Sequence, residues 1–276
     1  DRFAGVMRRA HEQSGQRVAV LVDEYDKPLL EAMDNPPLQD EFRKILKSFY
    51  GTMKGSDSDL QFVFLTGVTK FSKVSVFSDL NNIDDISMMN EYAGICGITQ
   101  QELDDNFSDE VVRMAAQSNQ SFDAMRQRLR DTYDGYHFSP CMLDVYNPFS
   151  LLSAFKKSEI GHYWFATGTP TFLIRLLKNA NYDLRRLSGI QVTASRLGDI
   201  SEPARDPVPI LFQSGYLTVK GYDPRFNRYS LDFPNAEVRQ GFFDALIPQY
   251  DLRTDAYGEE FDIGNFVMAV EQGDID

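Results

Sequence analysis

Residues 18–28 read VAVLVDEYDKP, and this stretch decides the fold. Its first five residues, Val18 to Val22, are apolar and mostly β-branched, and two adjacent carboxylates, Asp23 and Glu24, follow them directly. A short apolar run of this kind is typical of a strand buried on both faces of a parallel sheet that helices cover. The two carboxylates would then lie at the carboxyl edge of the sheet, where open α/β sheets bind their ligands.

In nucleotide hydrolases of the P-loop type, a buried strand followed by two acids is the Walker B element. The first carboxylate, here Asp23, would hold Mg²⁺, usually through water. The second, Glu24, would polarise the attacking water as a general base. The alternative interpretation is a buried strand that ends in a solvated acidic turn, because apolar runs followed by Asp-Glu are common.

A second apolar run, residues 60–65, follows an amphipathic helix predicted over residues 38–53. Strand, helix and strand with a connection of this length predict parallel neighbours joined by a right-handed crossover. The polar residues after the second strand should therefore emerge beside Asp23 and Glu24.

Thr66 directly follows this second strand. It is the candidate for the sensor 1 position of AAA-type ATPases, where a polar residue contacts the γ-phosphate or the attacking water. Thr69 and Lys70 are the next candidates for contact with the nucleotide. The alternative is that Thr66 and Gly67 form only a strand-to-loop turn.

Helical patterns dominate residues 99–200, after a capping box formed by Thr99 and Glu102. Two short strands, residues 217–222 and 229–233, then flank a turn and predict a hairpin, with a further helix after it. This order predicts a winged-helix-like module. Such modules place a helix in the DNA major groove, but few basic residues occur here, which favours a packing or lid role.

Composition limits the classes of partner. The 276 residues hold 28 Lys and Arg against 41 Asp and Glu, a formal net charge of -13, so the whole surface does not attract nucleic acid or anionic membrane. No stretch is long and apolar enough for a transmembrane helix, and no signal peptide is evident. The two cysteines, Cys96 and Cys141, are expected to be reduced, in a cytoplasmic protein.

The sequence does not contain the phosphate-binding pattern G-x-x-x-x-G-K-[ST], in which backbone N–H groups and a Lys cradle the phosphates. Residues 51–56, GTMKGS, have the wrong order and fall at the end of a predicted helix. The chain therefore carries half of a nucleotide site.

Several motifs together resemble the predicted AAA-ATPase-like proteins of gut and anaerobic bacteria, and they cover almost the whole chain. They are LVDEYDKP at 21–28, FLTGVTKFS at 64–72, DLNNIDDIS at 79–87, YDGY at 133–136, YNP at 146–148, TGTP at 167–170, FQSGYL at 212–217 and FPNAEVR at 233–239.

This resemblance implies an α/β core of P-loop NTPase type, with ATP as substrate and Mg²⁺ as cofactor. Asp23 would be the metal-associated carboxylate and Glu24 the base. The family usually carries a C-terminal PD-(D/E)XK nuclease-like domain, so nucleic acid is an implied partner through that domain, and the ATPase region would regulate it. A homo-oligomer is compatible with this family. The chain resembles the part between the Walker A loop and the nuclease region.

The expected organisation has four parts. Residues 1–98 form part of the ATPase core with Walker B, residues 99–205 a helical region, residues 206–257 the winged-helix-like module, and residues 258–276 a linker. The competing hypothesis is a non-catalytic interaction or nucleic-acid-binding module with a degenerate ATPase fold.

Overall fold

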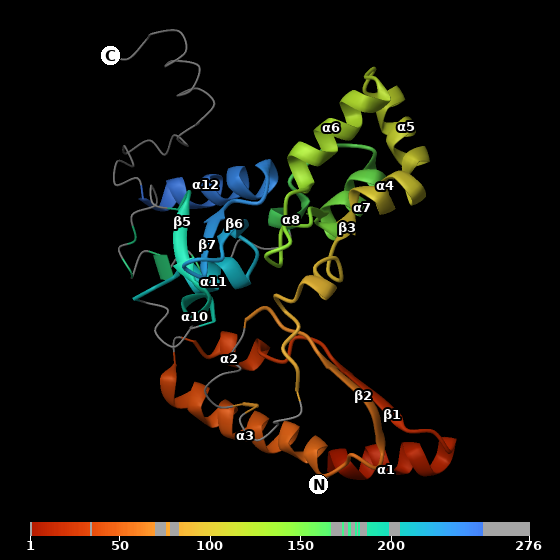
Figure 1. Ribbon diagram of the computed structural model, residues 1–276, viewed down its shortest axis with the longest axis vertical. Helices are drawn as coiled ribbons and strands as arrows, with labels where there is room; N and C mark the ends of the chain where they lie inside the picture. The colour runs from red at the N-terminus through yellow and green to blue at the C-terminus, as the bar shows by residue number, and fades with distance from the viewer. Residues whose placement is uncertain are drawn as a thin grey trace. The chain divides into compact units, whose positions relative to one another are not determined.

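The computed structural model describes residues 2–33, 35–69, 76–77, 83–166, 173, 176–177, 180, 182, 187–198 and 205–250. Helices and small sheets alternate along the chain, so it is an α/β protein (Figure 1). Contacts divide it into two compact units. The first holds residues 1–93, 138–142 and 183–232, and the second holds residues 94–137, 143–182 and 233–276.

The first unit begins with helix α1 (Arg2–Ser14), strand β1 (Val18–Val22), helices α2 (Lys27–Glu31) and α3 (Pro36–Lys54), and strand β2 (Leu60–Leu65). β1 and β2 pair in parallel, with Val22 opposite Leu65, which confirms the predicted strand–helix–strand arrangement. Asn35 caps α3 by accepting a hydrogen bond from the Leu38 amide, and Pro36 occupies its first position, so local sequence fixes where this helix begins.

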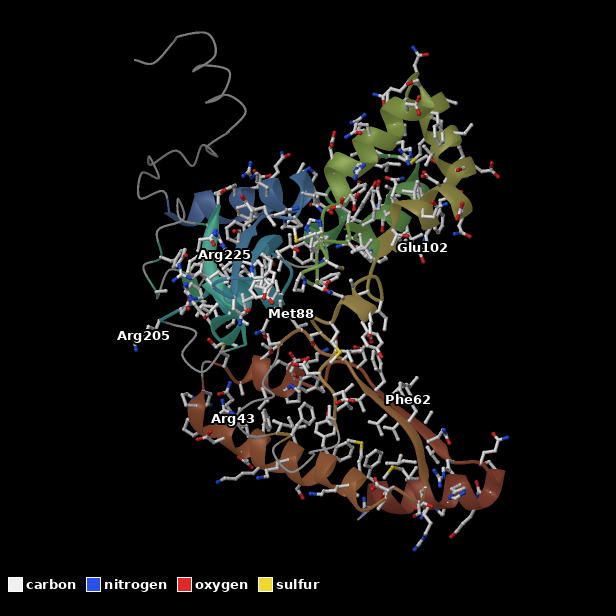
Figure 2. The ribbon with its side chains drawn as sticks, viewed as in Figure 1. Arg43, Phe62, Met88, Glu102, Arg205 and Arg225 are labelled. Atoms are coloured by element: carbon white, nitrogen blue, oxygen red, sulfur yellow. The ribbon has the colours of Figure 1, made fainter. Side chains whose placement is uncertain are left out.

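The prediction that this strand is buried on both faces is wrong for the described residues. Val20 is 9% exposed on the face toward the core, but Leu21 is 72% exposed and Phe62, on β2, is 54% exposed (Figure 2). Phe62 and Phe64 stack with ring centroids 6.1 Å apart on this open face. An apolar run therefore predicted the strand correctly, but it could not show which of its faces is covered.

A second sheet in this unit has the order β5-β7-β6 and is antiparallel. Strands β6 (Thr218–Asp223) and β7 (Arg228–Asp232) are the predicted hairpin. β5 (Ile190–Thr193) pairs with β7 and was not predicted, because residues 99–200 were expected to be mostly helical. Two short helices, α10 (Ala194–Leu197) and α11 (Val208–Gln213), complete this part.

The second unit is mainly helical, as predicted for this region. The 3₁₀ helix η2 (Asn90–Tyr92) belongs to the first unit and precedes the second along the chain. The elements of the second unit are β3 (Ile98–Thr99), α4 (Gln100–Asn106), α5 (Ser108–Gln117), α6 (Phe122–Tyr133), β4 (Val145–Tyr146), α7 (Pro148–Lys157), α8 (Tyr163–Ala166) and α12 (Ala236–Tyr250). Thr99 and Glu102 form the predicted capping box, and Asn147 caps α7. Leu129, Tyr133 and Tyr146 are fully buried in its core.

Among the described residues no helix combines the length and the apolar character needed to cross a bilayer. Cys96 and Cys141 are both exposed, and neither forms a disulfide.

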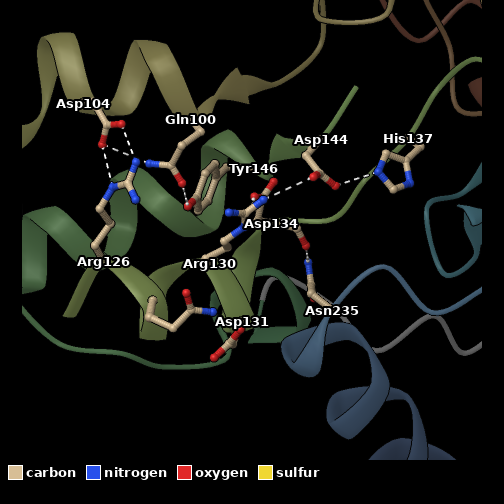
Figure 3. A network of polar contacts seen from close by, with 11 residues as sticks. Gln100, Asp104, Arg126, Arg130, Asp131, Asp134, His137, Asp144, Tyr146 and Asn235 are labelled. Atoms are coloured by element: carbon tan, nitrogen blue, oxygen red, sulfur yellow. Dashed lines mark hydrogen bonds and ion pairs between the residues drawn. The ribbon is translucent and has the colours of Figure 1, made fainter. Parts of the chain in front are cut away.

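A polar network lies beside this second core (Figure 3). Asp144 accepts from Arg130 at 3.3 Å and lies 2.6 Å from the His137 ring nitrogen. Asp134 is 3% exposed, and Arg130 Nε lies 3.5 Å from its Oδ2. Burial raises the pKa of Asp134, and the charge of Asp144 adds to the increase.

This buried carboxylate gives a pH-dependent prediction. The pKa of this carboxyl is higher in the folded chain than its ordinary value of 3.8. Its contribution to the free energy of unfolding is therefore fully present below pH 3.8 and is lost as the pH rises through the folded pKa. Asp134→Asn keeps the shape without the buried charge, so it should raise the free energy of unfolding at pH 7. Urea denaturation from pH 4 to 7 should show this gain shrinking toward zero at acid pH. Asp131→Asn, at an exposed position near the end of α6, serves as the control, and an equal gain for both would contradict this explanation.

Candidate functional site

The candidate site lies where β1 and β2 end. The parallel ladder continues one step beyond both strands, because the Thr66 amide donates to the Val22 carbonyl at 2.8 Å and the Tyr25 amide donates to the Thr66 carbonyl at 3.0 Å. Residues 23–25 and Thr66 are therefore held side by side by backbone hydrogen bonds. In the described part of the chain β1 has β2 as its one strand neighbour.

Asp23 and Thr66, the predicted metal-associated carboxylate and the predicted sensor, are in direct contact. Thr66 Oγ1 donates to Asp23 Oδ1 at 2.6 Å, and the Glu24 amide donates to the same oxygen at 2.9 Å. Asp23 is exposed and Thr66 is half-buried. The contact spans 43 positions of sequence, and it follows from the parallel register of the two strands.

Glu24, the predicted base, has a backbone angle φ of 53°, in the left-handed region that residues other than glycine and asparagine rarely adopt. Its carboxylate accepts from Lys27 Nζ at 2.9 Å. This hydrogen bond raises the pKa of Lys27. Both side chains are more than half exposed, so the pair contributes little to stability. The main effect of the ion pair is to orient the Glu24 carboxylate, and its effect on the stability of the chain is small.

Thr69, another predicted nucleotide contact, does not share this exposed position. Thr69 is 2% exposed, and its hydroxyl donates to Asp26 Oδ2 at 2.6 Å. Contact with a nucleotide would require this hydrogen bond to be exchanged. Lys70 lies outside the described residues.

Sequence reasoning noted Asp26 and Tyr25 within the motif but assigned neither of them a role at this edge of the sheet. Asp26 is fully buried and accepts from Val68 N, Thr69 N and Thr69 Oγ1. The Tyr25 hydroxyl donates to the Thr69 carbonyl at 2.7 Å. The sequence did contain a signal for this contact. Asp26 is the fourth residue after β1 and Thr69 is the fourth residue after β2, and residues at matching positions after two parallel strands can lie close together.

The oxygens of Asp23 and Thr66 suit a hydrated Mg²⁺, which binds through one or two carboxylates and keeps several waters. In the described residues no group of three His, Cys, Asp or Glu side chains is arranged to hold a metal ion. A metal at this edge would therefore depend on water and phosphate oxygens for most of its ligands, as Mg²⁺ commonly does at phosphate sites.

Part of the first unit is similar to a known protein family. Residues 1–77 match the family described as "Predicted AAA-ATPase". A relative from Azotobacter chroococcum mcd 1, described as "Uncharacterized protein in vnfD 5'region", is 41% identical over 257 residues. The match covers 90% of this chain and 46% of that protein, so the chain spans about half the length of this relative. No solved structure matches the chain.

Proposed function

From the match of residues 1–77 to a predicted AAA-ATPase family, we propose that this chain is part of an enzyme that hydrolyses the γ-phosphate of ATP. The proposal includes an α/β core of P-loop type, a helical region and a winged-helix-like end. The observation that carries it is the contact between Asp23 and Thr66, whose side chains meet at 2.6 Å at the ends of two parallel strands.

Each side chain at the site has a role in this reaction. The oxygen of a water forms a bond to the γ-phosphorus, and the bond from that phosphorus to the bridging oxygen breaks, which leaves ADP. Glu24 takes the proton from this water as general base. Thr66 orients the water or a γ-phosphate oxygen through its hydroxyl. Glu24 must exchange its hydrogen bond with Lys27 for one with the water before it can act.

Asp23, with the Thr66 hydroxyl beside it, would hold Mg²⁺ through water. The ion would neutralise negative charge that develops on the phosphate oxygens. The hydrogen bonds that Asp23 Oδ1 accepts from Thr66 and from the Glu24 amide keep the carboxylate oriented, so the protein would present one fixed acidic group to the hydrated ion.

A second candidate function is a non-catalytic interaction or nucleic-acid-binding module with an ATPase-like fold. The observation that favours it is the absence of G-x-x-x-x-G-K-[ST] from the 276 residues, since this loop supplies most of the donors that bind phosphates. In either case we propose that this region of the complete gene product regulates an attached nuclease-like domain, and that nucleic acid is a partner through that domain.

One comparison separates the two candidates. The 276-residue chain should give no saturable heat when micromolar protein is titrated with MgATP, because the phosphate cradle is not part of it. The product of the complete gene should bind MgATP and release phosphate. Tight binding by the chain alone would contradict our account of the site. A complete product that neither binds nor hydrolyses MgATP would favour the interaction module.

A further inference from the structure

Asp26 is a buried carboxylate at the candidate site whose role sequence reasoning left open. Its exposed fraction is 0%, and an ionised side chain in such a place needs hydrogen-bond donors to offset the loss of water. The donors all come from the loop after β2. Oδ1 accepts from the Val68 amide at 3.2 Å, and Oδ2 accepts from the Thr69 amide and from the Thr69 hydroxyl, the latter at 2.6 Å.

The backbone of Asp26 is itself held in place by hydrogen bonds. Its carbonyl accepts from the amides of Leu29 at 2.9 Å and Leu30 at 3.0 Å, so Asp26 caps the start of α2. Leu29 is fully buried, which fixes this helix in the core of the unit. Hydrogen bonds to a carboxylate are roughly twice as strong as those between neutral groups. Three such bonds to a carboxylate whose own backbone is fixed restrain the loop strongly.

Tyr25 and Gly67 extend the same contact. The Tyr25 hydroxyl donates to the Thr69 carbonyl at 2.7 Å. A Cβ atom on Gly67 would lie 2.5 Å from Asp26 Oδ1 and 2.7 Å from the Tyr25 ring, so the loop approaches this closely only with glycine at that position. The loop of residues 66–69 is therefore tied along its whole length to residues 23–26.

We infer that Asp26 is a positioning residue, whose buried carboxylate locks the loop after β2 to the turn after β1 and so holds Thr66 in place beside Asp23 and Glu24. Asp26 does not touch the reacting atoms, because it has no exposed surface and its oxygens are occupied by donors. This inference rests on the proposed ATPase function for its catalytic consequence but not for the lock itself.

The lock is tested first without any reaction, by amide hydrogen exchange in this chain. An asparagine side chain has one acceptor oxygen and one NH₂ group, which only donates. In Asp26→Asn the NH₂ group therefore replaces one of the two accepting oxygens and faces a donor of the loop in either orientation. Exchange at the Val68 and Thr69 amides should become at least about tenfold faster, while the Phe64 amide, which faces β1 in the parallel ladder, stays protected. Thr69→Val should show a smaller increase, and Thr69→Ser, which keeps the hydroxyl, should restore protection. These two variants decide the question if Asp26→Asn does not fold.

Asp104→Asn is the matched control for general destabilisation. It breaks the pair between Asp104 and Arg126 in the other unit and should leave exchange at Val68 and Thr69 unchanged (Figure 3). Unchanged exchange in Asp26→Asn, or equal exchange in Thr69→Val and Thr69→Ser, would overturn the lock.

The catalytic consequence is then measured in the complete gene product by steady-state phosphate release. Asp26→Asn should lower kcat by about 10- to 100-fold with KM for MgATP within about twofold, because loss of alignment affects the reacting geometry more than binding. Asp104→Asn should leave both constants unchanged. If Glu24→Gln is inactive while Asp26→Asn keeps the parental kcat, the positioning role is overturned. If the parental gene product releases no phosphate from MgATP, the proposed ATPase function fails, and the hydrogen-exchange result still tests the lock independently.

Discussion

Glu24→Gln in the complete gene product should bind MgATP with parental affinity and release phosphate about 10²- to 10⁴-fold more slowly, the usual contribution of a general base. The amide has the size of the carboxylate and can still form hydrogen bonds, but it cannot take a proton from the attacking water. Glu24 is exposed, so the change costs little stability. The left-handed backbone angle at position 24 is a property of the turn, and glutamine would adopt it as glutamate does.

The measurement is steady-state phosphate release together with nucleotide affinity. Glu31→Gln, the same change on the exposed end of α2, is the control and should keep the parental rate. Asp23→Ala should differ from Glu24→Gln by weakening MgATP binding as well as turnover, because it removes the acidic ligand that we propose for Mg²⁺. Hydrolysis by Glu24→Gln at the parental rate would exclude Glu24 as the base and favour a solvated acidic turn after the strand.

Tyr25 shows where an argument from strand geometry fails. Continued alternation along the strand predicts that Tyr25 points away from Glu24 and that Tyr25→Phe has little effect. The chain leaves the extended conformation at Glu24, with φ of 53°, and the Tyr25 hydroxyl then reaches the Thr69 carbonyl. Tyr25→Phe removes a hydrogen bond from the lock, so the structure predicts a larger effect than strand alternation does.

The elements that sequence predicted well are those with strong local signals. The apolar runs at residues 18–22 and 60–65 are β1 and β2, and their parallel pairing follows from the length of the helical connection. The cap at Thr99 depends on one side chain and its nearest amides. Because parallel strands end at the same edge of a sheet, the contact of Asp23 with Thr66 could also be anticipated.

The features that sequence could not provide depend on partners far away in the chain. Whether Leu21 is covered depends on what packs against the sheet, which no local pattern records. Strand β5 is four residues long and is defined by its pairing with β7. Asp26 reads as one more acid in a polar turn until the loop after β2 is placed beside it. The positioning part of the site was therefore missed, while its exposed part was found.

Gly67→Ala should be among the most destabilising single-methyl additions in the first unit. The added Cβ would lie 2.5 Å from Asp26 Oδ1 and 2.7 Å from a Tyr25 ring carbon, well inside van der Waals contact. Neither neighbour moves freely, because Asp26 is held by the loop donors and the Tyr25 hydroxyl is bound to Thr69. Overpacking of this kind costs about 1–3 kcal/mol of unfolding free energy, and here it also breaks hydrogen bonds to a buried carboxylate.

Gly51→Ala is the matched control, because the same methyl group on α3 meets nothing within 4 Å. Alanine has a higher helix propensity than glycine, so this variant should gain about 0.5–1 kcal/mol. Urea denaturation of the parental chain and both variants measures the two changes, which should have opposite signs. A Gly67→Ala variant as stable as the parent would mean that the loop after β2 does not pack against Asp26 and Tyr25. In that case Thr66 would not be held beside Asp23 by this lock, and its alignment would have to come from the strand ladder alone.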